Sequence, residues 1–309
     1  MMKRGHSVFA YVLFLSLLLF ISAGCGTSKF SAKADKGAQS FDISHLKKRI
    51  LVFPFIDEAG LGKNIISKVT LHLVASLNDS DDFVAYMYRG GVKCELEASD
   101  SLNSFGIVCN SDILEQARTA NMNTVLTGIV YMQDSGTRRK GIWPFNNTVQ
   151  AYTVSIVINV VDVVSGTLML SKRDCHDLLF PLDNGKPKRD EVVTRAVNEG
   201  VLYMLDRMSP EITRVIERQS WTSKIVSVDK DSIKIGAGSE AGIFKGFIFT
   251  VFAKGEKIKT ASGRLYNLIG KEIGKLQVTD VHKTFSLARP LKGDSFAPGQ
   301  IVRPFTSAD

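Results

Sequence analysis

Apolar and polar segments alternate from residue 50 onward, and their spacing predicts the first structural elements. Ile50-Leu51-Val52-Phe53 is wholly apolar, which is typical of a strand covered on both faces, and Pro54 ends that strand. A helix is predicted over Lys63 to Leu77, because apolar residues recur there on one helical face. The residues of this face are Ile65, Ile66, Val69, Leu73 and Leu77.

Runs of β-branched and aromatic residues predict the next strands. These runs are Phe83 to Tyr86, Thr124 to Tyr131 and Val149 to Val164. The turn residues Ser165-Gly166 make the run from Leu168 to Ser171 a hairpin partner of the strand before it. Ahead of Thr124, Asp112 and Glu115 have the spacing of a capping box, which predicts a short helix ending at Ala120.

A long helix is expected after the polar loop at residues 183–187, with an apolar face from Val192 to Met208. Ser209-Pro210-Glu211 then predicts a restart, with Ser209 at the N-cap and Pro210 at the first helical position. Residues 46–219 therefore contain both strands and helices, which indicates an α/β (α+β) domain with a mixed sheet and flanking helices.

The pattern changes at Trp221, after which no helical period returns. A hairpin is indicated by the alternating pairs Val226/Val228 and Ile233/Ile235 on either side of a polar turn. Further short β-rich runs follow at 247–252, 273–281 and 301–302, and glycines separate them. Many short strands separated by Gly turns predict a small all-β barrel or sandwich over residues 220–309. A domain boundary is expected within a few residues of Ser220.

The first 25 residues form a separate signal. Lys3 and Arg4 are basic, the apolar run from Val8 to Ile21 is shorter than the ~20 residues that span a bilayer, and small residues follow. The ending Ala23-Gly24-Cys25 resembles the bacterial lipobox, although Ser22 stands where that family usually has Leu. A transmembrane anchor and an ordinary cleaved signal are the alternatives.

The lipobox resemblance implies that residues 1–24 are removed and that Cys25 carries a diacylglycerol. The protein would then be held by lipid at the outer membrane and face the periplasm, because Gly26 follows the cysteine instead of the Asp that resembles an inner-membrane retention signal. Residues 25–45 are expected to be a flexible tether, because residues 26–40 are mostly Ser, Lys, Ala and Gly and have little to bury.

Composition restricts the partners and leaves the redox state open. The formal net charge of +8 is spread over 309 residues without a basic stripe among aromatics, so no nucleic-acid partner is expected. Cys94 and Cys109 flank one polar loop in a chain that is expected to reach an oxidising compartment. A Cys94–Cys109 disulfide and free thiols there remain equal alternatives.

Several segments resemble known families. Residues 50–55, 124–130 and 158–167 look like the curli-secretion lipoprotein (CsgG-like) family, whose domain type also resembles the middle domain of the flagellar H-ring protein FlgT, penicillin-binding-protein activators and the N-terminal domain of TolB. Residues 241–251, 273–281, 286–289 and 298–302 follow the order of the SH3-like C-terminal domain of FlgT. The resemblance implies a subunit of a ring or scaffold.

One departure concerns the curli channel, whose subunits each insert two hairpins into the membrane. The corresponding stretches are Asp134 to Thr148 and Cys175 to Lys188. A spanning hairpin needs two strands of about 9–11 residues with alternating apolar faces. The first stretch does not alternate and contains Pro144, and the apolar part of the second is too short, so no pore is expected.

No enzyme chemistry is predicted. The histidines are far apart, Cys175-His176 alone does not make a zinc site, and Gly60-Leu61-Gly62-Lys63 lacks the spacing of a phosphate loop. We therefore expect no catalytic residues, no cofactor and no metal. The best surface candidate lies at an expected hairpin tip, where cations stand beside aromatics as in protein interfaces. Its residues are Arg138, Arg139, Lys140, Trp143 and Phe145.

Two classes of function follow. The first is a non-enzymatic, lipid-anchored subunit that joins a homo-oligomer or ring in an envelope machine, with a flagellar basal-body ring as the favoured case. The second is an activator of a cell-wall synthase or an accessory of curli-type secretion. The tether favours the first, because residues 26–40 reach only ~50 Å when fully extended. Solvated cations with Trp143 folded onto the body remain the alternative for the candidate site.

Overall fold

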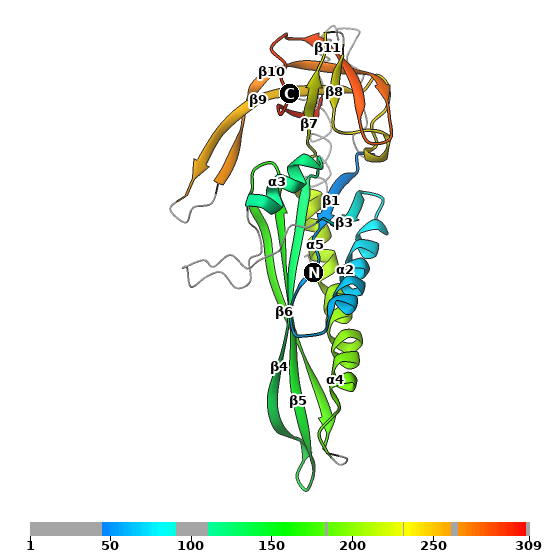
Figure 1. Ribbon diagram of the computed structural model, residues 1–309, viewed down its shortest axis with the longest axis vertical. Helices are drawn as coiled ribbons and strands as arrows, with labels where there is room; N and C mark the ends of the chain where they lie inside the picture. The colour runs from blue at the N-terminus through cyan, green and yellow to red at the C-terminus, as the bar shows by residue number, and fades with distance from the viewer. Residues whose placement is uncertain (1–44, 91–110, 183–184, 231, 261–264, 307–309) are drawn as a thin grey trace, which may run out of the picture. The chain divides into compact units, whose positions relative to one another are not determined.

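The computed structural model describes residues 45–90, 111–182, 185–230, 232–260 and 265–306. This part of the chain is mixed α+β and rich in strands (Figure 1). Strands β1 to β6 form a six-stranded mixed sheet, and strands β7 to β12 form a closed barrel. No helix among these residues is long and apolar enough to cross a membrane.

The predicted first strand is β1 (Lys48–Val52), and it lies inside the sheet, whose order is β3-β1-β4-β5-β6. It pairs in parallel with β3 (Phe83–Met87) and with the start of β4 (Thr124–Ile142). Ile50 and Val52 belong to one buried cluster and Leu51 to another, so both faces of β1 are covered, as the apolar run indicates. The short strand β2 (Ile56–Glu58) pairs with β4.

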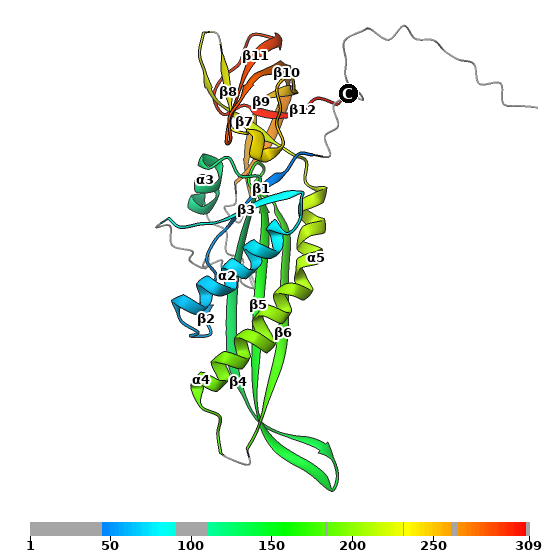
Figure 2. The same cartoon turned by 90° about the vertical axis from the view of Figure 1, so that its right-hand side faces the viewer.

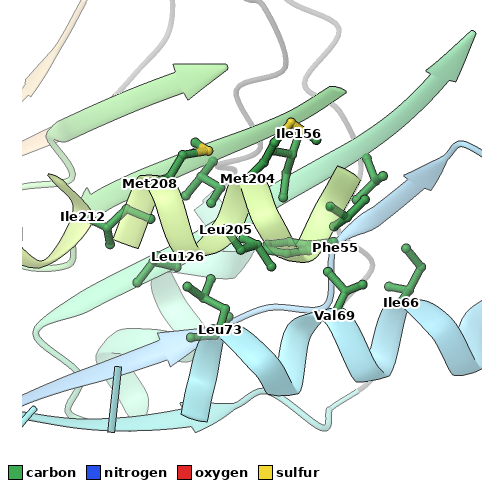
Figure 3. Close-up of a cluster of buried hydrophobic side chains, with 14 of the residues drawn as sticks. Phe55, Ile66, Val69, Leu73, Leu126, Ile156, Met204, Leu205, Met208 and Ile212 are labelled. Carbon is green, nitrogen blue, oxygen red and sulfur yellow. The ribbon is translucent and has the colours of Figure 1, made fainter. Parts of the chain in front are cut away.

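Helices cover one face of the sheet (Figure 2). Helix α2 (Lys63–Asn78) matches the predicted helix, and its buried residues Ile66, Val69 and Leu73 contact the same core as α5 (Leu202–Arg218). Figure 3 shows Met204, Met208 and Ile212 of α5 in that core, near sheet residues such as Leu126 and Ile156. The smaller helix α3 (Ser111–Thr119) buries its apolar residues in a second cluster, with Leu51 and Val125.

The predicted helix restart at Ser209 is wrong, because α5 continues through Pro210 without a break. Helix α4 (Arg189–Arg195), the π-helical turn Ala196–Val201 and α5 follow one another directly. Pro210 is exposed, whereas Met208 and Ile212 on either side of it are fully buried. Burial of these flanking residues thus outweighs the backbone hydrogen bond that the proline cannot make.

Strands β4 and β6 are much longer than the hydrophobic pattern predicts, whereas β5 is close to its predicted length. β4 ends at Ile142, β5 spans Phe145–Asp162, and β6 spans Leu168–Pro181. The β4–β5 ladder runs from Thr124↔Asp162 to Ile142↔Phe145 with one irregularity, between Asp134 and Thr137. The stretch from Asp134 to Thr148 is therefore a paired hairpin, although its sequence does not alternate.

The carboxy-terminal strands close into a barrel, which decides between the two predicted architectures. The barrel order is β10-β11-β8-β7-β12-β9. Its strands are β7 (Ser223–Val228), β8 (Ile233–Ile235), β9 (Ile248–Lys259), β10 (Leu265–Val281), β11 (Ser286–Lys292) and β12 (Ile301–Pro304). Trp221 stacks on Phe249 in the barrel core, with ring centroids 5.8 Å apart. Leu46, from the segment before β1, joins the same core.

Residues 221–309 are expected to fold without the sheet, because the six strands pair only with one another and supply, with Trp221 and the turns between them, every described residue of the barrel core except Leu46. The isolated fragment should give a far-ultraviolet spectrum of β type and one cooperative thermal transition. A second fragment that adds residues 40–48 should melt at a higher temperature, since it restores Leu46. A helix-dominated spectrum, or the absence of a transition in both fragments, would contradict this prediction.

Candidate functional site

The candidate site is the tip of the β4–β5 hairpin, which lies beyond the ends of the helices in Figures 1 and 2. Ile142 pairs with Phe145, so Trp143 and Pro144 form the turn. Gly141 precedes it with a φ of +119°, and a Cβ there would lie 2.4 Å from the carbonyl oxygen of Phe145. This position therefore needs glycine for both its conformation and its close approach to the opposite strand.

Three large apolar side chains at the tip are almost fully exposed. The exposed fractions are 84% for Ile142, 83% for Trp143 and 86% for Phe145. The other exposed large hydrophobic residues of the described chain expose at most 51%. Burial of such side chains against a partner would gain about 1.5–3 kcal/mol each from the hydrophobic effect. Among the described residues, the most exposed large apolar side chains therefore lie together at this tip.

The register divides the predicted residues between two faces of the hairpin. Side chains of directly paired residues share a face, and every second residue of a strand returns to it. The paired residues at the tip include Arg138↔Val149, Lys140↔Asn147 and Ile142↔Phe145. The cations Arg138 and Lys140 therefore lie on the same face of the hairpin as Ile142 and Phe145. Arg139 lies on the other face, opposite Thr148.

Arg138 differs from the other two cations because it has a carboxylate partner in the sheet. Its Nη1 atom lies 2.7 Å from Oδ2 of Asp177 on β6, and the Thr153 hydroxyl donates to Oδ1 of the same carboxylate at 2.6 Å. The hydrogen bonds from Thr153 and Arg138 hold the pKa of Asp177 below its usual value. Arg138 thus fixes the base of the tip, whereas Arg139 and Lys140 are exposed cations.

The structure brings together Arg138, Lys140 and Phe145 on one face, with Trp143 at the turn. It adds Ile142, which the sequence reasoning missed although the residue precedes Trp143 directly. Cys25, Cys94 and Cys109 lie outside the described residues. Cys175 is an exposed free cysteine on β6, and the ring of its neighbour His176 lies 5.9 Å from that of Tyr203. Among the described residues, no group of three or more His, Cys, Asp or Glu side chains is placed to hold a metal ion.

Comparisons with known proteins give matches only among solved structures. No protein-family model and no curated protein matches the chain. A neuraminyllactose-binding hemagglutinin homolog from Helicobacter pylori is 13% identical over 61% of this chain and 96% of its own, with a TM-score of 0.37. Lipoprotein GNA1162 from Neisseria meningitidis is 18% identical over 55% of this chain and 99% of its own, with a TM-score of 0.29.

A further match is PelC from Paraburkholderia phytofirmans, solved as a dodecamer. It is 12% identical over 53% of this chain and 93% of its own, with a TM-score of 0.27. At these identities and TM-scores, the similarities assign neither a family nor a function to the chain.

Proposed function

We propose that this protein is a non-enzymatic, lipid-anchored subunit of an assembly in the bacterial envelope, and that it contacts its partner through the β4–β5 hairpin tip. The observation that carries the proposal is the exposure of Ile142, Trp143 and Phe145 beside exposed cations. Aromatic and Arg side chains dominate the energetics of protein interfaces when a partner desolvates them. The signal that ends at Cys25 supports attachment to the periplasmic face of the outer membrane.

A ring of identical subunits is the assembly that we favour. The sequence resemblance to the CsgG-like and FlgT families supports it and suggests a flagellar basal-body ring. A head-to-tail contact, in which one surface of each copy meets a different surface of the next, closes into a ring when the rotation between copies divides a full turn. The tip would be one of these two surfaces.

The tip variant Trp143→Ala/Phe145→Ala should abolish most of the self-association while the fold stays intact. Loss of two central interface residues costs about 2 kcal/mol or more each, which weakens association by about 30-fold per residue. Sedimentation of the detergent-solubilised lipoprotein over a concentration series measures this change. The melting temperature should not fall, because both side chains are almost fully exposed.

The variant Leu71→Ala/Leu291→Ala provides the matched control, because it removes two exposed apolar side chains from α2 and β11. It should associate like the unmodified protein. Replacing all five predicted residues by alanine should weaken assembly further, with some loss of stability from the Arg138–Asp177 ion pair. Unchanged association of the Trp143/Phe145 variant would overturn the proposed contact.

A further inference from the structure

Side-chain hydrogen bonds join the barrel to the start of the sheet. The Asn123 side chain accepts from the backbone N–H of Arg49 at 2.9 Å and donates to the carbonyl of Thr222 at 2.6 Å. The buried guanidinium of Arg49 donates to the carbonyl of Gly236. On β10, the Asn267 side chain donates to the carbonyl of Val164 at 3.1 Å. Contacts at several positions therefore fix the geometry of this junction.

A cavity of about 400 Å³ opens at the junction, within the size range of ligand sites. Its walls come from the end of α3, the segment after β5, and strands β7, β9 and β10. The cavity shares no residue with the hairpin tip, so a ligand in the cavity and a partner at the tip can be tested independently.

Positive charge dominates the lining. The lining contains four cationic side chains and one carboxylate, that of Glu115. The cations are Arg118, Lys224, Lys254 and Lys257. Among the described residues, none of these four cations lies within ion-pair distance of a carboxylate. The half-buried cations Arg118 and Lys224 lose part of their hydration without gaining an ion pair, and the exposed Lys254 and Lys257 add positive charge beside them.

Backbone contacts hold two of these cations at the site. The Nε atom of Arg118 donates to the carbonyl of Val163 at 3.0 Å, and Nζ of Lys224 donates to the carbonyl of Arg118 at 2.5 Å. Burial lowers the pKa of Lys224; Glu115 partly offsets this effect, and Arg118 and Arg49 add to it. A bound anion would reverse the shift, since it would stabilise the charged amine.

The rest of the wall is apolar. Met122 and Ile301 are half-buried there, and the Leu268 side chain is 49% exposed. The cations come from three separate elements and stand among these apolar residues. Carboxylates spaced along an extended chain match this arrangement better than one compact headgroup does. We propose that the cavity between α3 and the barrel binds an acidic peptide segment of a partner protein, with apolar residues between its carboxylates.

The test uses the intact lipoprotein in a nonionic detergent and a fluorescent nonapeptide in which Glu alternates with Leu. Binding measured by fluorescence anisotropy should weaken by about tenfold in the variant Arg118→Gln/Lys224→Gln and should fall as salt rises. The same peptide with Gln in place of Glu should bind at least tenfold more weakly. The variant Lys230→Gln/Lys245→Gln, which removes two exposed lysines outside the cavity lining, should bind like the unmodified protein.

A second readout does not depend on variants. The Glu peptide should protect Lys224 from acylation by an amine reagent, as mapped by mass spectrometry, and should leave Lys245 reactive. Equal binding of the Glu and Gln peptides, equal effects of the two variant pairs, or reactivity of Lys224 that the peptide leaves unchanged would overturn the proposal. Binding to phosphatidylglycerol vesicles without binding to the Glu peptide would overturn it in favour of a lipid.

Discussion

Replacing Cys25 by alanine is expected to move the protein from the membrane fraction to the soluble or unprocessed fraction. The reason is the anchor chemistry that the lipobox-like ending Ala23-Gly24-Cys25 predicts. Each buried methylene of an acyl chain contributes about 0.8 kcal/mol to membrane binding, so loss of the chains removes most of the attachment energy. Incorporation of labelled palmitate and fractionation of cell membranes measure the two effects together.

Cys175→Ala is the matched control for this experiment, because Cys175 is an exposed free cysteine on β6. This variant should retain both palmitate and membrane attachment. If Cys25→Ala is still processed and still sediments with membranes, the lipid anchor is not at Cys25 and the envelope attachment in the proposed function needs another explanation.

Replacing Gly128 by alanine is expected to cost about 3 kcal/mol of folding free energy, at the upper end of overpacking effects. A Cβ at this position in β4 would lie 2.3 and 2.4 Å from two carbons of the Phe55 ring, and 3.0 Å from the carbonyl oxygen of Val157. Phe55 is itself only 4% exposed, so the ring would have to shift within the packed core. The melting temperature of the intact protein should fall by about 10 °C.

A double-mutant cycle separates this clash from the general cost of a changed strand residue. Phe55→Ala alone should destabilise the sheet by about 3–5 kcal/mol, because it leaves a cavity in the core. In that background, Gly128→Ala should cost far less than it does beside the intact ring. Additive effects of the two substitutions would show that the ring and the glycine do not constrain each other.

The sequence predicts the buried parts of the fold well, because hydrophobic periodicity reports burial. The strand expected at Thr124 to Tyr131 is the apolar first part of β4, where Thr124 to Val130 are buried, whereas the rest of that strand is polar and largely exposed. Backbone pairing with β5 extends the strand there, and pairing leaves no periodic signal in the side chains. The alternation around Asp229-Lys230 likewise predicts β7 and β8. Closure of the barrel depends on pairing between strands that are distant in the sequence, and the pattern does not report such pairing.

The two candidate sites differ in how far the sequence can reveal them. The hairpin-tip residues lie within eight positions of one another, so cations and aromatics are visible as a cluster before the fold is known. Arg118, Lys224 and Lys254 come from three elements that are distant in the chain, and only the junction of sheet and barrel places them in one cavity. Local spacing carries no information on such a group.

The position of β1 between β3 and β4 determines how the sheet bears a mechanical load. Ile50, Leu51 and Val52 each pair with β3 on one side and β4 on the other, and the chain that leads back toward Cys25 leaves from the amino-terminal end of this strand. Tension applied there pulls along the strand, whereas the hydrogen bonds run across it. The bonds are then loaded in shear and must yield together rather than in succession. Tension from the amino-terminal side would therefore first pull Leu46 out of the barrel core and would then load β1 in shear.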